Sequence, residues 1–140
     1  MKYTIDVVRS GGRGRLIFSH GTIQVNTECW WDPNVVIDSG TYTGFATRMD
    51  NKWDGRKTSL GKATKREAIW FGTAKTPYNR RVGFSGGIFI HKGTNPGWSD
   101  GCVVCHGNEV LRIWDVIVPK DQGNVQINVI NTYDVDAYKP

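Results

Sequence analysis

The sequence predicts a mainly β fold of the α+β type, with one short helix. Three observations favour this class. Several segments alternate apolar and polar residues with the period of two that is typical of half-buried strands. Seventeen glycines among 140 residues indicate many turns. One segment, residues 108–117, repeats its apolar side chains at helical spacing, at Val110, Leu111, Ile113, Trp114 and Ile117.

The N-terminal part of the chain is expected to supply most of the strands. Residues 2–9 alternate and predict a first strand, and Gly11-Gly12 predicts a turn after it. A hairpin is expected next, with a turn at His20-Gly21. Its strands are Arg15–Ser19 and Thr22–Thr27, and after a loop at 30–34 a further strand covers 41–49.

The C-terminal part is expected to begin with a long loop. Residues 50–67 are polar and basic and show no clear period, so they predict a loop that flanks a groove. The elements that follow are a short apolar run at 68–72, a turn-rich segment at 75–81, a buried strand at 86–91, the helix at 108–117, a last strand at 125–132 and a peripheral tail at 133–140.

Length and charge bound the kind of protein. At 140 residues, the chain is expected to form one domain, 1–140. Its net charge is +5, and the basic residues concentrate between Arg48 and Arg81. Such a surface attracts polyanions, although we interpret most of these residues as a solvated face. No apolar run approaches the roughly 20 residues that a membrane span needs, and the N-terminus lacks the apolar core of a signal peptide.

The segment 88–104 carries the chemistry. A β-type run ends at His91, a loop rich in Gly, Pro and Asn follows, and the chain returns to Cys102 behind Ser99-Asp100-Gly101. A thiol becomes a good nucleophile when a base at hydrogen-bond distance takes its proton, and a histidine is such a base. Three successive N–H groups at 100–102 are suited to an anion-binding concavity beside the sulfur. The pattern predicts a Cys–His acyl-transfer site.

These residues resemble the L,D-transpeptidase catalytic domains, whose signature is a strand-end histidine, a loop, and Ser-x-Gly-Cys-(Ile/Val). Asp38-Ser39-Gly40-Thr41-Tyr42 is similar to the strand entry of that family, and the resemblance extends over residues 35 to 115. The small relatives with a short loop, several of them phage-borne, are the most similar. The resemblance implies a β-sandwich or barrel with a short helix after the cysteine. It also implies a thioester on Cys102 formed with a peptidoglycan stem peptide, and no metal or cofactor.

In the roles that the resemblance implies, His91 is the base, and its other ring nitrogen faces a backbone carbonyl, that of Lys92 or Gly93. Three departures leave the exact reaction open. The interval between histidine and cysteine is short, Asp100 stands where the family usually has histidine, and Val103-Val104 stand in place of its arginine. Transpeptidase, carboxypeptidase and endopeptidase reactions share one acyl-enzyme. A non-catalytic wall-binding or structural module of the same fold is the alternative.

Arg81, Trp98 and Tyr42 are the candidates for substrate binding. A guanidinium pairs with a carboxylate in a bidentate way, and Arg81 shortly precedes the strand that delivers the histidine. Arg48 and Arg112 are further candidates for binding a carboxylate, but the interpretation as surface arginines is favoured for both. The expected partners are peptidoglycan stem peptides and not nucleic acid. The protein is expected to be a monomer. Such a chain would reach the wall through phage lysis, a virion or an export machine, or the sequence is that of a mature form.

Cys102-Val103-Val104-Cys105-His106 also matches C-x-x-C-H, the attachment motif of c-type haem. A zinc site built from these cysteines, His106 and His91 is a second alternative, although a single C-x-x-C is a weak indication of metal. In a third interpretation, Cys105 is a resolving thiol that forms a disulfide with Cys102. Cys29 is predicted to be a buried, inert thiol.

Overall fold

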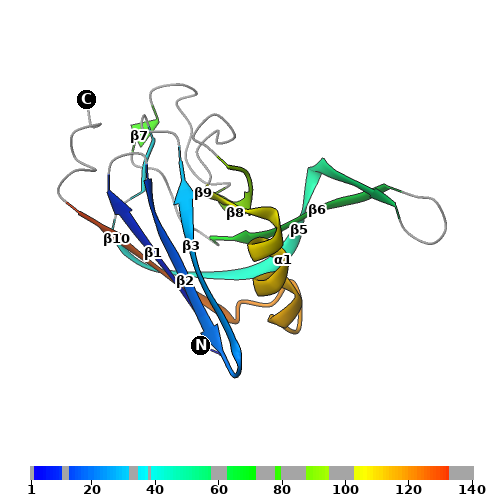
Figure 1. Cartoon of the computed structure of the whole chain (residues 1–140), viewed down its shortest axis with the longest axis horizontal. Coiled ribbons are helices and arrows are strands. Elements are labelled where there is room, and N and C mark those ends of the chain that lie inside the picture. The colour runs from blue at the N-terminus through cyan, green and yellow to red at the C-terminus, as the bar shows by residue number, and fades with distance from the viewer. Residues whose placement is uncertain are drawn as a thin grey trace.

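The alternating segments form strands, and eight of the strands close into a barrel (Figure 1). The computed structural model describes residues 2–10, 13–31, 35–37, 39–57, 63–71, 78–79, 88–94 and 103–132. The strands are β1 (Tyr3–Ser10), β2 (Arg13–His20), β3 (Ile23–Trp30), β4 (Val35–Val36), β5 (Gly40–Lys57), β6 (Ala63–Trp70), β7 (Tyr78–Asn79), β8 (Phe89–Lys92), β9 (Val103–Cys105) and β10 (Val125–Asn131). The helix α1 spans Gly107–Val116. The mainly β class is therefore confirmed.

The barrel order is β1-β10-β5-β6-β8-β9-β3-β2, and β4 pairs with β7 in a separate two-stranded sheet. Two neighbouring pairs in the barrel are parallel, β1 with β10 and β8 with β9, and the other pairs are antiparallel. The parallel β8–β9 pair matters most for function, because β8 carries His91 and β9 begins directly after Cys102 in the sequence. The barrel thus brings the two halves of the predicted Cys–His segment to adjacent strands.

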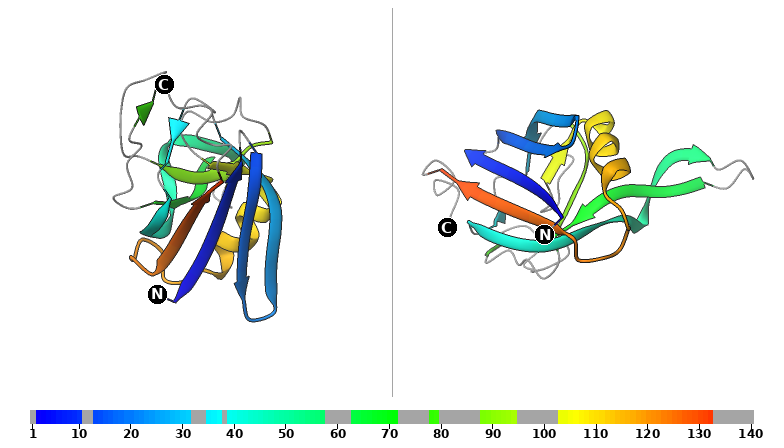
Figure 2. Two further views of the ribbon diagram at one scale, coloured as in Figure 1. Left: turned by 90° about the vertical axis from the view of Figure 1, so that its left-hand side faces the viewer. Right: turned by 90° about the horizontal axis from the view of Figure 1, so that it is seen from below.

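Inward-facing side chains fill the barrel. The alternation along β1 buries Tyr3, Ile5 and Val7, and the neighbouring strands add Leu16 and Phe18 to the same cluster. The helix lies beside β3, β6 and β8 (Figure 2) and contributes its own apolar stripe to this core. The residues of that stripe are Val110 and Ile113, with Ile117 directly after the helix.

The C-terminal end of α1 is held by a lysine and a tryptophan. Lys120 Nζ donates to the carbonyl oxygens of Trp114 and Ile117, at 2.6 Å each, and lies 4.0 Å from the centre of the Trp114 ring. Burial lowers the pKa of Lys120, and the nearby Asp115 opposes this shift. Trp114 Nε1 donates to the Thr47 carbonyl at 2.7 Å, which joins the helix to β5. Within the described residues, no helix has the length and apolar character that crossing a bilayer requires.

A buried arginine lies at the end of β1. Arg9 is fully buried, its guanidinium lies 4.3 Å from the centre of the Trp31 ring, and it donates to the Ile37 carbonyl at 3.4 Å. Burial lowers the pKa of Arg9 to about 10. The ring and the carbonyl offset part of the cost of removing the cation from water.

The prediction of a long loop at 50–67 was wrong. β5 continues to Lys57, and β6 begins at Ala63 and pairs with it, with irregularities in register between Met49 and Trp53 and between Trp53 and Lys57. This part of β5 and β6 runs out from the barrel as a two-stranded ribbon (Figures 1 and 2). The sequence there shows no alternation because a ribbon beyond the barrel has no core that would require one.

Candidate active site

His91 is the second-last residue of β8, with 5% of its surface exposed. Its neighbour Ile90 points into the core cluster, so the alternation of side chains places His91 on the opposite, outer face of the strand. In the parallel pairing, His91 is aligned with Val104 of β9, which is likewise buried and likewise outside the core cluster. The strand end therefore presents the imidazole on the outside of the barrel, next to β9.

One ring nitrogen of His91 faces a backbone carbonyl, as the family resemblance implied. Nδ1 lies 2.9 Å from the carbonyl oxygen of Lys92. A carbonyl oxygen only accepts hydrogen bonds, so Nδ1 must carry the proton. In the neutral ring, the lone pair is then on Nε2. This is the tautomer that a general base needs, and the backbone fixes it without a carboxylate.

The other predicted members of the catalytic set lie outside the described residues. They are Ser99, Asp100, Gly101 and Cys102, and the same is true of the substrate-binding candidates Trp98 and Arg81. Their roles stay predictions. The described frame contributes His91 and the start of β9 at Val103, the residue that follows the cysteine.

The structure adds an aromatic residue at a position for which the sequence predicts a loop. Trp30 is the last residue of β3 and is aligned with Val104, which in turn is aligned with His91. The three side chains therefore share the outer face across three adjacent strands. The Trp30 ring also makes an edge-on contact with His106, at 5.5 Å between ring centres. The alternation of inward and outward side chains along β3 continues to residue 30, and this pattern is the local signal that could have placed Trp30 in the strand.

Cys29 and Cys105 are directly opposite each other in the β3–β9 pairing, and both are fully buried free thiols in the core. Burial raises the pKa of Cys29 to about 12 and also raises the pKa of Cys105. The prediction that Cys29 is a buried thiol is confirmed.

The position of Cys105 bears on the haem, zinc and resolving-thiol alternatives. A haem thioether on this sulfur would lie inside the core, which disfavours C-x-x-C-H as a haem attachment site. A disulfide with Cys102 would require the Cys105 sulfur to leave the core. His106, the third member of the motif, is exposed. In the part of the chain that the structure describes, no three His, Cys, Asp or Glu side chains gather as metal ligands would.

Arg48 and Arg112 make structural contacts, in agreement with their interpretation as surface arginines. Arg48 lies 3.7 Å from the buried Glu67 carboxylate and stacks over Trp114 at 4.8 Å. Arg112 pairs with Glu109 at 3.2 Å in the same helix and donates to a β3 carbonyl. These contacts join α1 to β5, β6 and β3.

Tyr42 is placed apart from His91. It is aligned with the core residue Ile127, packs against the core cluster, and its ring centre lies 6.0 Å from that of Phe71. Tyr42 therefore lies on the inner face of its strand, whereas His91 lies on the outer face of β8. A role for Tyr42 in substrate binding stays a prediction.

Comparison with known proteins gives one family. The model of the YkuD family, described as the L,D-transpeptidase catalytic domain, matches residues 21–129. No curated protein and no solved structure matches the chain. The matched range contains β3, the β8–β9 pair, α1 and most of β10, and it covers well over half of the sequence. The chain therefore belongs to the family of L,D-transpeptidase catalytic domains, a family that acts on peptidoglycan.

Proposed function

We propose that this protein is a cysteine acyl-transfer enzyme that forms a thioester with a peptidoglycan stem peptide. The single observation that carries the proposal is the contact between His91 Nδ1 and the Lys92 carbonyl, at 2.9 Å. It fixes the tautomer in which Nε2 is the base.

The register of β8 and β9 supports Cys102 as the nucleophile. Position 102 is two residues before Val104, and side chains two residues apart along a strand share a face. Val104 is aligned with His91. If the alternation of β9 extends back by one residue, the Cys102 thiol is on the outer face with the imidazole and away from the core that holds Cys105.

The proposed reaction has two steps. His91 Nε2 takes the Sγ proton of Cys102, and the thiolate attacks a stem-peptide carbonyl, whose oxyanion is stabilised by backbone N–H groups at 100–102. The imidazolium then donates its proton to the leaving amine, and the thioester remains. In the second step an amine or water attacks the thioester, and His91 removes the proton of the attacking group and returns it to the sulfur. The acceptor decides between transpeptidase and hydrolase outcomes.

Substrate recognition is proposed for Arg81, Trp98 and Tyr42. A stem peptide carries free carboxylates, which a guanidinium binds in a bidentate way. Arg81→Ala should therefore lower activity more than Lys57→Ala, which removes an equal charge. Both variants should be compared with the wild type at low salt, where electrostatic attraction is least screened. Equal rates for the wild type and Arg81→Ala would remove Arg81 from the site.

The test of the proposal is incubation with purified peptidoglycan, followed by mass analysis of the released or joined fragments and of the intact protein. A stem-peptide adduct on the protein should appear in the wild type and in Cys29→Ala, and it should be missing in Cys102→Ala. If the wild type gives neither an adduct nor altered fragments and yet sediments with peptidoglycan, the protein is a wall-binding module without chemistry. Processing by Cys102→Ala would contradict the mechanism.

A further inference from the structure

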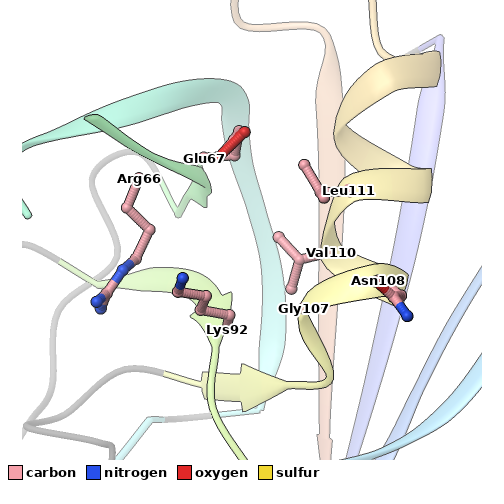
Figure 3. A pocket seen from close by; sticks show the side chains of 7 residues that line it. All are labelled: Arg66, Glu67, Lys92, Gly107, Asn108, Val110 and Leu111. Atoms are coloured by element: carbon pink, nitrogen blue, oxygen red, sulfur yellow. The ribbon is translucent and has the colours of Figure 1, made fainter. Parts of the chain in front are cut away.

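A pocket lies between α1 and the strands β6 and β8, with a volume of about 280 Å³. Its walls are formed by Arg66, Glu67, Lys92, the first turn of α1, and two apolar side chains of the same helix (Figure 3). The volume is just below the range of about 300–1,000 Å³ for small-molecule sites. A pocket of this size fits a small group and not a glycan strand.

Two cationic side chains line this pocket from adjacent strands. Figure 3 shows the Lys92 side chain extending toward Arg66, with Val110 and Leu111 of α1 on the other side. Among the described residues of the lining, the acidic side chain is Glu67, and Arg48 lies 3.7 Å from its carboxylate. The positive charge of Arg48 offsets the negative charge of Glu67, so the described part of the lining favours an anion.

Arg66 also carries a polar atom that needs a partner. Its Nε is buried, and no hydrogen-bond acceptor for it lies among the described residues. A buried donor without an acceptor costs free energy comparable to a lost hydrogen bond, and more for a charged group. An oxyanion in the pocket would supply an acceptor to this guanidinium.

The first turn of α1 forms part of the same lining. Gly107 and Asn108 line the pocket, and the first N–H groups of a helix have no acceptor within the helix. The N-cap position is His106, whose side chain makes no capping hydrogen bond. Gly107 lies close beside Lys92: a Cβ atom at this glycine would be 3.6 Å from the Lys92 Cβ. A helix N-terminus stabilises negative charge, as the cationic side chains of Arg66 and Lys92 also do.

From these features we propose that the pocket binds a phosphate group, either free or as the monoester of a small alcohol. The site is on the opposite face of β8 from His91, because side chains alternate along a strand and Lys92 follows His91 directly. It is therefore separate from the place where the stem peptide is proposed to react, and it does not depend on that proposal. Arg66 binds the phosphate through its fork of N–H donors, and Lys92 adds a point charge.

The test uses the full chain, with inorganic phosphate and n-propyl phosphate as probes, against sodium chloride of equal ionic strength. Binding is measured by calorimetry and by NMR of ¹⁵N-labelled protein. Addition of phosphate should shift the Arg66 Nε–H signal and the amide signals of Lys92, Gly107 and Asn108. If both probes shift these signals, a tighter binding of n-propyl phosphate assigns the site to an ester, whose hydrocarbon part contacts Val110 and Leu111. Equal affinity assigns it to free phosphate.

Arg66→Gln and Lys92→Gln should each weaken phosphate binding by about tenfold, the loss expected for one charge-assisted hydrogen bond. Arg15→Gln is the matched control, because it removes an equal charge from an exposed β2 side chain that bonds to Asn26. It should bind phosphate like the wild type. The mapping on wild-type protein does not depend on whether the variants fold. Phosphate shifts that spread over the surface, or that match those caused by chloride, would overturn the proposal, as would equal weakening by all three variants.

Discussion

The imidazole Nδ1 of His91 lies 2.9 Å from the carbonyl oxygen of Lys92, the next residue of the same strand. Lys92 therefore has one role on each face of β8. Its backbone oxygen sets the tautomer of the histidine on the outer face, and its side chain lines the phosphate pocket on the other. A substitution at Lys92 retains the carbonyl, so the two roles are separable by mutation.

The first prediction concerns the base. His91→Gln should lower kcat by about 10²–10⁴-fold, the range that a positioned general base contributes, with a much smaller change in KM. His20→Gln is the control. It removes a histidine at the turn between β2 and β3, where the imidazole contacts the Tyr3 ring. Steady-state rates on peptidoglycan fragments over a range of pH measure both. Retention of most activity in His91→Gln would exclude this residue as the base.

The second prediction concerns the reactivity of the three thiols. In the native protein, an alkylating reagent at neutral pH should modify one cysteine per chain, and in denaturant it should modify three. Cys29 and Cys105 are fully buried, and burial raises the pKa of both thiols, so neither offers a thiolate. Peptide mapping by mass spectrometry should place the native label on Cys102, and Cys102→Ala should take up none. A native label on Cys105 would mean that β9 opens readily.

The third prediction concerns stability at high pH and follows from the burial of the Cys29 thiol. The pKa of Cys29 rises from 9.0 to about 12 because of burial, which Arg9 only partly offsets. Between these pH values the unfolded state has lost the thiol proton and the folded state retains it. The stability contributed by the neutral thiol is therefore complete below pH 9 and is lost as pH rises toward 12. The loss is about 1.4 kcal/mol per pH unit for one thiol.

Denaturant titrations of wild type and Cys29→Ala at a series of pH values test this. The variant should be less stable at pH 7, because it leaves a cavity in the core. Its free energy of unfolding should fall less steeply above pH 9 than that of the wild type. Tyr and Lys side chains ionise in both proteins, so their contribution cancels in the difference between the two free energies of unfolding. Parallel curves above pH 9 would contradict the shifted pKa of Cys29.

Local patterns predicted most of the strands and the helix, because those elements face the core and need periodic apolar residues. The helix expected at 108–117 is Gly107–Val116 in the structure, and the strand expected at 2–9 is Tyr3–Ser10. The same reasoning failed at 50–67, where the ribbon of β5 and β6 leaves the barrel and no core imposes a period.

The sequence could not show which residues meet across the barrel. Cys29 and Cys105 are far apart in the chain, and only the register of β3 with β9 places them opposite each other. The alignment of Trp30, Val104 and His91 across three strands is likewise a product of register. The family resemblance did imply that His91 would turn one nitrogen to a backbone carbonyl, and that contact lies between neighbours in the chain.

The last prediction concerns the packing of β5 against its neighbours, on which the position of β8 depends through β6. A Cβ atom at Gly44 would lie only 1.8 Å from the carbonyl oxygen of Trp70, a backbone atom that cannot move without separating β5 from β6. Gly44→Ala should therefore lower the free energy of unfolding by about 1–3 kcal/mol, the usual cost of overpacking, or by more.

Gly123→Ala is the matched control, because its added methyl group would meet only the Thr43 side chain at 3.5 Å, an ordinary contact distance. It should change stability by less than about 0.5 kcal/mol. Urea titrations of the two variants against wild type give both values. Because β8 pairs with β6 at Trp70, the displaced carbonyl is next to the strand that carries His91. Gly44→Ala should then also reduce activity under conditions in which it is still folded, and full activity in a strongly destabilised Gly44→Ala protein would show that β8 holds its histidine independently of β5.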